Sequence, residues 1–581
     1  MARASTLHRR PAPMGAGRLL ARVALGSTGL AAILLLLVYP LVSFLLLAVF
    51  PGLFGQSGQG FSLAAFAQAL DGYALQSVLN SLAIGLSSGA LAVGLGLYVS
   101  WLTQRTTLSV RRLVDGAVWL LLLTPSYLLA IGWLVLTQHG GLLNQAGLHW
   151  GWLEAAFSGP IGVALVLAVK HIPFAYLAIA PSWNTIGGEL EEAAQVHGIR
   201  GGQATLLLAK LLLPAIAAAF AVVFAEALSD FGVAATLGAS SNVPLLTYSI
   251  YRALYANPLN FPLAAASSWI LLALAGIAVW AQARVNRRAA AYAVLSGRGR
   301  LARRVVLGGY GKAVAWFSLG LLGLVALAIP ALATVFMSFT KVLGDGLNWA
   351  NLGLDNYQTV LRQGDLLGPL TYSGMLAGLA ATTALVLALV LASVLSSGSR
   401  LARGLDVVLL GTLALPGLVL AAGYIFAYNQ PFLPLYGTSL LLGMAYAAGA
   451  MPSSSRILLG PLTQLHHSLG EAARVHGVSG LGVLRRITLP LLAQPLLYAW
   501  LLAASGIVFE LPASELLYPP GQPPLAVALL KSVHNFDFGL STALEVVAVA
   551  IVVGTVWLIR AVVTRLLPPN WQRRLNEQHS H

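Results

Sequence analysis

Long apolar runs dominate this sequence of 581 residues. Each run approaches or exceeds the roughly 20 mostly apolar residues that an α-helix needs to cross the hydrocarbon core of a bilayer. Only 9% of the residues are charged, whereas soluble domains hold about 25%. We therefore expect an all-α polytopic membrane protein with about twelve spanning helices, and the composition excludes a soluble enzyme. The twelve runs lie near residues 23–50, 75–101, 113–137, 160–182, 206–229, 262–283, 313–338, 370–396, 405–428, 437–456, 487–509 and 540–563.

A basic stretch divides the chain after the sixth run. Residues 284–312 contain seven arginines and only short apolar segments. We expect a first repeat of six helices over residues 1–283, a basic cytoplasmic linker over 284–312, and a second repeat of six helices over 313–581. An even number of helices in each repeat places the two repeats parallel to each other in the membrane.

The distribution of basic residues predicts the orientation. Cytoplasmic loops of membrane proteins collect Lys and Arg. With the N-terminus inside, the external loops hold only four of the 33 basic residues, which are Arg252, Lys341, Arg362 and Lys531. Both termini and the linker are then cytoplasmic. The net charge of +15 does not indicate nucleic-acid binding, because the basic residues lie in short clusters between apolar runs.

A polar octamer occurs once in each half. Residues 191–198 read EEAAQVHG and residues 470–477 read GEAARVHG, and 279 residues separate Glu192 from Glu471. Both copies lie between the fourth and fifth helices of their halves, on the predicted cytoplasmic side. One copy alone would equally fit a loop at the membrane surface, but two matching copies indicate two equivalent contact points for a partner. The expected contact residues are Glu192, Ala193, Ala194, Gly198, Glu471, Ala472, Ala473 and Gly477.

Residues 471–490, EAARVHGVSGLGVLRRITLP, resemble the EAA signature of permease subunits of type I ABC importers. That resemblance implies a coupling helix that docks on an ATP-binding subunit, with EAA segments near 189–205 and 468–484. Both halves together resemble the fused two-domain permeases, and the implied fold is two parallel six-helix repeats. The first copy departs from the signature, since fifteen residues separate Gly198 from Pro214 and only twelve separate Gly477 from Pro490.

The sequence contains no ATP-binding loop of its own. Such a loop reads GxxxxGK followed by Ser or Thr. The nearest match, Gly311-Lys312, is followed by Ala313. We therefore expect a transport subunit without enzymatic activity or a bound cofactor, whose ATP is used by separate ABC ATPase subunits in two copies. The membrane lipid is its other expected partner, and nucleic acid is not.

Four carboxylates lie near the predicted outer ends of equivalent helices. Glu226 and Asp230 end the fifth run, and Glu510 and Glu515 follow the eleventh. An ionisable group at membrane depth is by default a functional hypothesis. Carboxylate oxygens suit a hard cation, so these residues are candidates for the translocation pathway, although no metal site is predicted firmly. The alternative is that they are solvated at the external surface or paired with basic residues of the outer loops.

The segments around these carboxylates point to a cargo. SDFGVAATLG at 229–238 and FELPASELLYPPG at 509–521 resemble the DFG and KELPAT-like segments of fused iron(III) permeases. The resemblance implies an importer in the bacterial inner membrane that receives iron(III) from a periplasmic binding protein. Thiamine, aminophosphonate and polyamine permeases share this architecture and remain alternatives.

Two other classes of protein are weaker alternatives. A secondary transporter driven by an ion gradient also has parallel halves, but it does not need two EAA segments. No nucleophile beside a base and no cluster of His and Asp supports a membrane-embedded enzyme. For Lys170, in the middle of the fourth run, we expect a structural role, because a lysine at membrane depth needs a partner or access to water.

Overall fold

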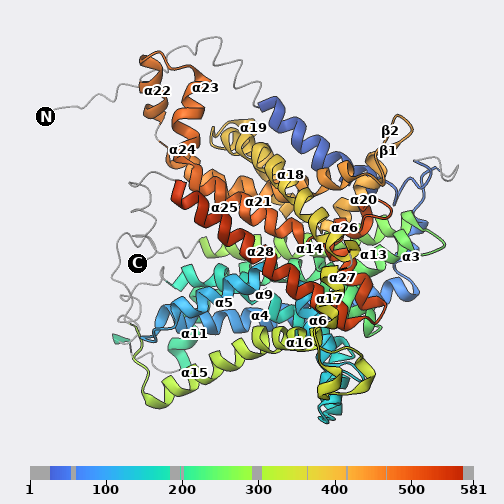
Figure 1. Ribbon diagram of the computed structural model, residues 1–581. Coiled ribbons are helices and arrows are strands. Elements are labelled where there is room, and N and C mark those ends of the chain that lie inside the picture. The colour runs from blue at the N-terminus through green and yellow to red at the C-terminus, as the bar shows by residue number, and fades with distance from the viewer. Residues whose placement is uncertain are drawn as a thin grey trace.

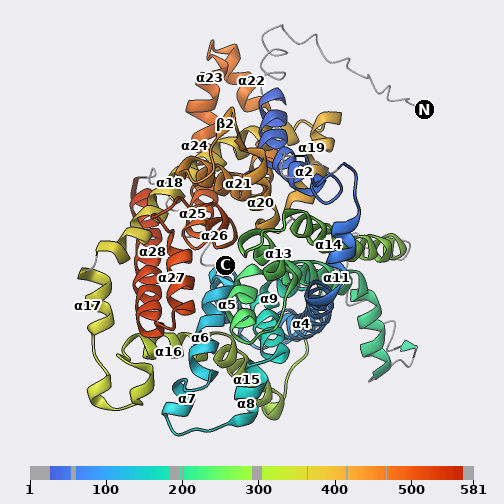
Figure 2. The same ribbon diagram turned by 90° about the vertical axis from the view of Figure 1, so that its right-hand side faces the viewer.

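A computed structural model gives the fold of the chain. It describes residues 26–53, 60–183, 196–197, 202–290, 304–362, 364–413, 416–465 and 467–566. Within these ranges the regular structure is almost entirely helical, as Figures 1 and 2 show. The sole sheet there is a hairpin of β1 (Asn429–Gln430) and β2 (Leu433–Pro434), which pair antiparallel. This confirms the predicted all-α class.

Nine helices in the described ranges are long and apolar enough to cross a membrane, and a tenth span is bent by 72° between Leu491 and Ala493. A further helix, α21 (Ser439–Gln464), is long enough but less apolar, because Ser453, Ser454 and Ser455 interrupt it. The nine helices are Gly26–Leu46, Gly72–Arg105, Ser126–Gln145, Pro160–Trp183, Lys210–Gly238, Phe261–Val285, Gly309–Ser338, Leu367–Leu395 and Phe538–Ile559.

Proline breaks two of the predicted runs. The third run forms α5 (Arg111–Leu123) and α6 (Ser126–Thr137), which are separated at Pro125. The ninth run forms α19 (Arg400–Leu413) and α20 (Gly417–Ala427), and Pro416 precedes α20. Proline weakens a helix interior, because it lacks the N–H group and its ring clashes with the preceding turn. Helices α9 (Pro160–Trp183) and α21 nevertheless continue through Pro173 and Pro452. In the third run, the break leaves backbone carbonyls that a side chain of another helix can reach.

The two halves contain the same order of helices. Each pair of corresponding helices occupies the same place in its half, including the short helices that follow the fifth span. The pairs are α4 (Gly72–Arg105) and α18 (Gly364–Leu395), α9 (Pro160–Trp183) and α21, α11 (Gly202–Ser229) and α25 (Ala493–Val508), α12 (Phe231–Val233) and α26 (Pro512–Leu517), α13 (Leu246–Tyr255) and α27 (Leu525–His534), and α14 (Phe261–Ala290) and α28 (Phe538–Leu566). Helix α14 runs into the stretch predicted as the linker, since it ends at Ala290.

The halves interlock through their first helices. Helix α2 (Tyr39–Leu46) of the first half packs on α20 of the second, and α16 (Ile329–Ser338) of the second half packs on α6 of the first. The hydroxyl of Tyr424 on α20 donates a hydrogen bond to the Leu36 carbonyl at 2.9 Å. One continuous apolar core contains buried side chains of both halves. The two halves therefore form one bundle.

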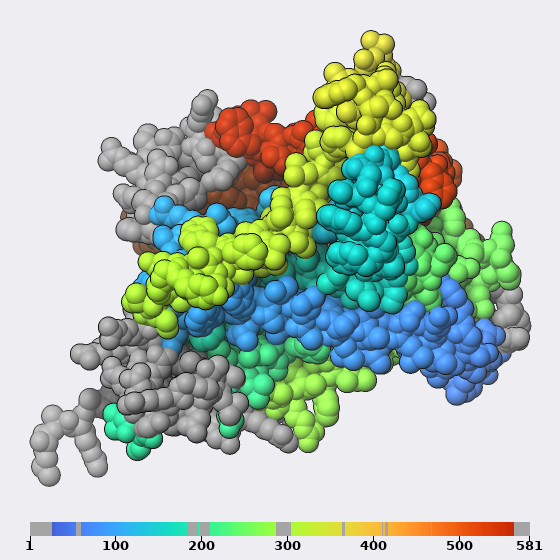
Figure 3. Space-filling model, turned by 90° about the horizontal axis from the view of Figure 1, so that it is seen from below, coloured from blue at the N-terminus to red at the C-terminus, as the bar shows by residue number. Residues whose placement is uncertain are grey.

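Helix α15 (Gly309–Gly323) lies along the outside of the first half. In Figure 3 the yellow-green segment that contains α15 and α16 crosses the blue surface of α4. The Tyr98 hydroxyl of α4 and the Ser318 hydroxyl of α15 are 2.5 Å apart. Ala315 and Leu319 join a core cluster with side chains of α4, α5 and α9.

Candidate functional site

The second EAA segment forms a helical hairpin. Glu471, Ala472 and Ala473 lie on α22 (His467–Val475), which ends at a turn where Gly477 has a φ of +77°. The Val478 amide donates to the Ala473 carbonyl at 3.0 Å, which is the bond of a Schellman C-cap with glycine in the left-handed conformation. The chain then reverses into α23 (Gly480–Val483). In Figure 1 this hairpin projects from one end of the bundle, far from α3 (Ala64–Ala69) and α13.

An apolar side chain is exposed at the same position of both EAA segments. Val475 and Val196 are each 84% exposed, and each precedes the histidine and glycine that close its octamer. Both EAA segments therefore present an apolar side chain at the same position. Four predicted contact residues of the first copy, Glu192, Ala193, Ala194 and Gly198, lie outside the described residues.

Asp230 caps a short helix in the first half. Helix α11 ends at Ser229, so Asp230 begins a new turn and does not share one continuous helix with Glu226. Its Oδ1 accepts hydrogen bonds from the Val233 amide at 2.7 Å and from the Ser126 hydroxyl at 3.0 Å. The second bond ties the break between α5 and α6 to the end of α11.

Lys170 satisfies the carbonyls that the break in the third run exposes. Its Nζ donates to the carbonyl oxygens of Leu121, Leu122 and Thr124 at 3.0, 3.2 and 2.6 Å. Lys170 is only 9% exposed. One lysine thus caps a broken helix, which agrees with the expected structural role.

Glu510 is the counterpart of Asp230 in the second half. It follows α25 and caps α26, where its Oε1 accepts from the Ala513 amide at 2.9 Å and its Oε2 accepts from the Ser514 amide at 3.0 Å. The Ser514 hydroxyl donates to the same Oε2 at 3.1 Å and lies 2.6 Å from the Tyr446 hydroxyl. Each fifth span therefore ends at a carboxylate that caps the next short helix.

Glu515 joins the two halves. It lies on α26, and its Oε1 accepts a hydrogen bond from the Tyr251 hydroxyl of α13 at 2.9 Å. A second cross-half contact places Nε2 of His534, on α27, 3.1 Å from the Ala235 carbonyl. Both contacts lie at the end of the bundle opposite the α22–α23 hairpin (Figure 1). Polar contacts therefore join the two halves at this end of the molecule.

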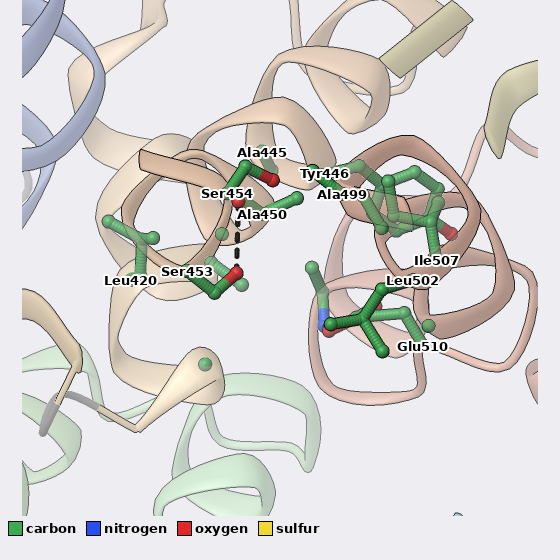
Figure 4. A pocket seen from close by; sticks show the side chains of 16 residues that line it. Leu420, Ala445, Tyr446, Ala450, Ser453, Ser454, Ala499, Leu502, Ile507 and Glu510 are labelled. Carbon is green, nitrogen blue, oxygen red and sulfur yellow. Dashed lines mark hydrogen bonds between the residues drawn. The ribbon is translucent and has the colours of Figure 1, made fainter. Parts of the chain in front are cut away.

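A cavity of about 320 Å³ opens beside Glu510. Helices α20, α21, α25 and α26 enclose it, and Figure 4 shows the Glu510 side chain at one side with Ser453 and Ser454 across from it. Small residues, including Gly449, Ala450 and Gly506, form much of its wall. The cavity therefore has mostly small and apolar walls, with one carboxylate and the hydroxyl groups of Tyr446, Ser453 and Ser454.

Glu545 and Tyr127 were not among the residues predicted from the sequence. Glu545 lies on α28, is 7% exposed, and its Oε2 has no hydrogen-bond partner within the described ranges; the same is true of the Tyr127 hydroxyl on α6. The signal for Glu545 was its acidic side chain within the last apolar run. Across the described part of the chain, no three His, Asp or Glu side chains gather in a way that could hold a metal ion.

A duplicated helical bundle with interior carboxylates and an exposed EAA hairpin defines a membrane permease. The chain belongs to the family described as "binding-protein-dependent transport system inner membrane component", whose profile matches residues 92–291 and 384–572. The family is therefore present twice, and the predicted resemblance to fused two-domain permeases of ABC importers is confirmed. The chain is a transport subunit of the inner membrane, in a family that works with ATPase and periplasmic binding-protein partners.

The chain is also similar in sequence to individual transport permeases. The ferric transport system permease protein FbpB of Actinobacillus pleuropneumoniae is 23% identical over 553 residues, which cover 90% of this chain and 77% of that protein. The putative ferric transport system permease protein FbpB 1 of Haemophilus influenzae is 25% identical over 516 residues. The matched region covers 84% of this chain and 78% of that protein. The thiamine transport system permease protein ThiP of Brucella abortus is 26% identical over 171 residues, 29% of each chain.

Proposed function

We propose that this chain forms the translocation pathway of an ATP-driven importer for iron(III), which a periplasmic binding protein delivers. The observation that carries this proposal is the similarity to two ferric transport permeases over 90% and 84% of the chain, whereas the thiamine permease matches only 29%. The segments 229–238 and 509–521, which resemble iron(III) permeases, surround the carboxylates Asp230, Glu510 and Glu515. Oxygen ligands of this kind suit a hard cation.

The two EAA segments are the proposed contacts with two ATPase subunits. Both termini are then cytoplasmic, and the hairpin of α22 and α23 points into the cytoplasm. ATP binding brings the ATPases together and moves the two EAA segments toward each other. Exposed Val196 and Val475 support this role, because each presents an apolar side chain for a partner to cover.

The pathway opens at the opposite end of the bundle. Helix α2 packs on α20, and helix α16 packs on α6. When one half moves, it therefore carries the first helix of the other half with it. Movement at the EAA segments then separates the Tyr251–Glu515 contact, and the carboxylates Glu226, Asp230, Glu510 and Glu515 become accessible to the binding protein. Hydrolysis returns the bundle to the closed arrangement and releases iron inward.

Uptake of radiolabelled iron(III) into proteoliposomes tests this proposal. The vesicles contain this chain with its ATPase and binding protein, as wild type or as Gly477→Asp, since a left-handed glycine tolerates no side chain without strain. Gly308→Asp is the matched control, because Gly308 is the N-cap of α15, where aspartate is favourable. We expect ATP-dependent iron uptake that Gly477→Asp abolishes and Gly308→Asp retains.

Two other results of the uptake experiment would each overturn part of this proposal. ATP-dependent uptake of thiamine, a phosphonate or a polyamine without iron uptake would keep the class of transporter and overturn the cargo. Uptake that continues without any ATPase would overturn the coupling role of the EAA segments and favour an ion-coupled secondary transporter.

A further inference from the structure

The third and ninth apolar runs occupy equivalent places in the two halves, and each contains two helices. Helices α5 and α6 form the third run, and α19 and α20 form the ninth. An aspartate stands ten residues before the proline of each break, since Asp115 precedes Pro125 and Asp406 precedes Pro416 by that number. Both halves therefore share the break and a carboxylate on the helix that precedes it.

The two helices of each run pack against different neighbours. Helix α5 packs on α4 and α9, and α19 packs on α18 and α21, which are the corresponding helices of the other half. Helix α6 packs chiefly on α16, and α20 packs chiefly on α2, so each contacts the first helix of the other half. In Figure 1, α5 and α19 lie toward the end of the bundle that carries the α22–α23 hairpin, and α6 and α20 lie toward the opposite end. Each break therefore separates two groups of helices.

Asp115 joins α5 to the fourth helix of the first half. The Tyr176 hydroxyl on α9 donates a hydrogen bond to Oδ1 of Asp115 at 2.8 Å. Tyr176 is buried, and its ring belongs to a core cluster with side chains of α4, α5 and α15. Lys170, on the same helix α9, donates to the Leu121 and Leu122 carbonyls at the other end of α5. Helix α5 is therefore bonded to α9 near both of its ends.

Asp406 makes the corresponding contact in the second half. Nη2 of Arg456, on α21, lies 2.7 Å from Oδ1 of Asp406. Arg456 stands four residues after Pro452, and Tyr176 stands three residues after Pro173, so both partners lie about one turn beyond the same proline. A charged donor forms a stronger contact with a carboxylate than a neutral hydroxyl does. The two halves thus use different donors for one connection.

The fourth helix of each half leads directly into the EAA segment. Helix α21, which carries Arg456, ends at Gln464, and α22 begins at His467. Helix α9, which carries Tyr176, ends at Trp183, and the first octamer begins at residue 191. A displacement of an EAA segment therefore acts first on α9 or α21. The bonded aspartate then passes that displacement to α5 or α19.

We propose that Asp115 and Asp406 are positioning residues, which connect the EAA segments to the third and ninth runs through their partners on α9 and α21. Helices α5 and α19 turn with the EAA segments about the breaks at Pro125 and Pro416, while α6 and α20 keep their contacts with the first helix of the other half. Hinge motions occur where a few residues separate rigid elements. This inference rests on the proposed function, because it assumes that the EAA segments move when ATP binds.

The distance between α5 and α19 tests the inference without any cargo. Leu113 on α5 and Val407 on α19 are exposed, and the chain contains no cysteine, so Leu113→Cys with Val407→Cys accepts two spin labels. Pulsed electron paramagnetic resonance measures the distance between the labels in the detergent-solubilised complex with its ATPase subunits. We expect the mean distance to change when a non-hydrolysable ATP analogue is added.

Two conservative variants each remove one connection. Tyr176→Phe keeps the buried ring but removes the donor to Asp115, and Asp406→Asn removes the charge that faces Arg456. Each variant should reduce the nucleotide-dependent change in distance at least twofold, and both together should abolish it. The double variant Asp406→Arg with Arg456→Asp should restore the change, since it rebuilds an ion pair with the charges exchanged.

Matched controls remove similar bonds outside the two runs. Tyr98→Phe removes the hydroxyl contact with Ser318 between α4 and α15. Lys341→Gln removes the ion pair with Asp355, whose charged atoms are 3.2 Å apart. Both controls should keep the full change in distance. Co-purification of the ATPase subunits should stay within twofold of wild type in every variant, which shows that the complex has assembled.

Transport gives a second readout. Iron(III) taken up per ATP hydrolysed by the reconstituted complex should fall at least fivefold in Asp406→Asn and recover in the charge-exchanged variant. A full change in distance in both Tyr176→Phe and Asp406→Asn, or none in wild type, would contradict this inference. Failure of the charge exchange to restore a change that Asp406→Asn has lost would also count against it. Absence of ATP-dependent iron uptake by wild type, with the distance changes as expected, would instead overturn the proposed cargo.

Discussion

Gly132 lies so close to the backbone of Pro330 that a Cβ at Gly132 would stand 2.5 Å from the Pro330 carbonyl oxygen. The same relationship joins Gly423 and Pro40, where the distance is 2.4 Å. The first contact places α6 against α16, and the second places α20 against α2. Small residues let membrane helices approach closely, and here they do so at equivalent positions of both halves. The interlocking of the halves therefore depends on two glycines.

Adding one methyl group at either glycine should weaken the bundle. We expect Gly132→Ala and Gly423→Ala each to destabilise the protein by about 1–3 kcal/mol, because the backbone of the facing helix must shift. Thermal unfolding in detergent measures the effect. Gly276→Ala, with open space around its Cβ position, should leave the midpoint unchanged. Equal midpoints for Gly132→Ala and Gly276→Ala would show that the close approach is not required.

Replacement of Lys170 by methionine should also lower stability. Met has a similar length but cannot donate to the carbonyls of Leu121, Leu122 and Thr124, so buried acceptors lose their partner at a cost of about 1–3 kcal/mol. The same thermal assay applies. Lys531→Met is the control, since Lys531 is exposed. An equal, small change in both variants would contradict the capping role of Lys170.

Much of this fold could be predicted from the sequence, because spanning helices must be long and apolar. The predicted runs near 75–101 and 370–396 correspond to α4 and α18. The breaks in the third and ninth runs were not predicted, although Pro125 and Pro416 were visible. A proline in an apolar run allows either a kink or a complete break, and packing decides between them.

The candidate site could be predicted only in part. The acidic residues Asp230 and Glu510 stand out because carboxylates are rare in apolar sequence. Their capping bonds and the carbonyl partners of Lys170 depend on residues of other helices, which spacing along the chain does not reveal. The cavity was also hidden, since its lining residues come from four helices that are far apart in the sequence.

Replacing either exposed valine with a charged residue should weaken the contact with the ATPase subunits. We expect Val475→Asp and Val196→Asp each to reduce co-purification of the ATPase subunits several-fold, because a carboxylate replaces an apolar side chain that a partner covers. Val306→Asp is the control, as Val306 is 73% exposed but lies outside both EAA segments. Since all three positions are exposed, thermal stability should not change. Undiminished co-purification with both variants would contradict docking at these valines.

A reversible cross-link between cysteines introduced at the positions of Tyr251 and Glu515 should stop transport. The chain contains no cysteine, so Tyr251→Cys with Glu515→Cys introduces the only thiols. These positions come from different halves and are joined by a 2.9 Å hydrogen bond at the end opposite α22. If that end opens in each cycle, a short bifunctional thiol reagent with an internal disulfide should block ATP-driven uptake, and reduction should restore it.

The matched control for this experiment lies within one half. Asn260 donates to Gln68 at 3.2 Å near the same end of the bundle, so the pair Asn260→Cys with Gln68→Cys can be cross-linked without joining the halves. Uptake should continue in that variant after cross-linking. Uptake that continues after complete cross-linking of Cys-substituted positions 251 and 515 would show that this contact stays closed during transport. The opening would then have to occur elsewhere, because a covalent bridge between the halves cannot be separated by ATP binding.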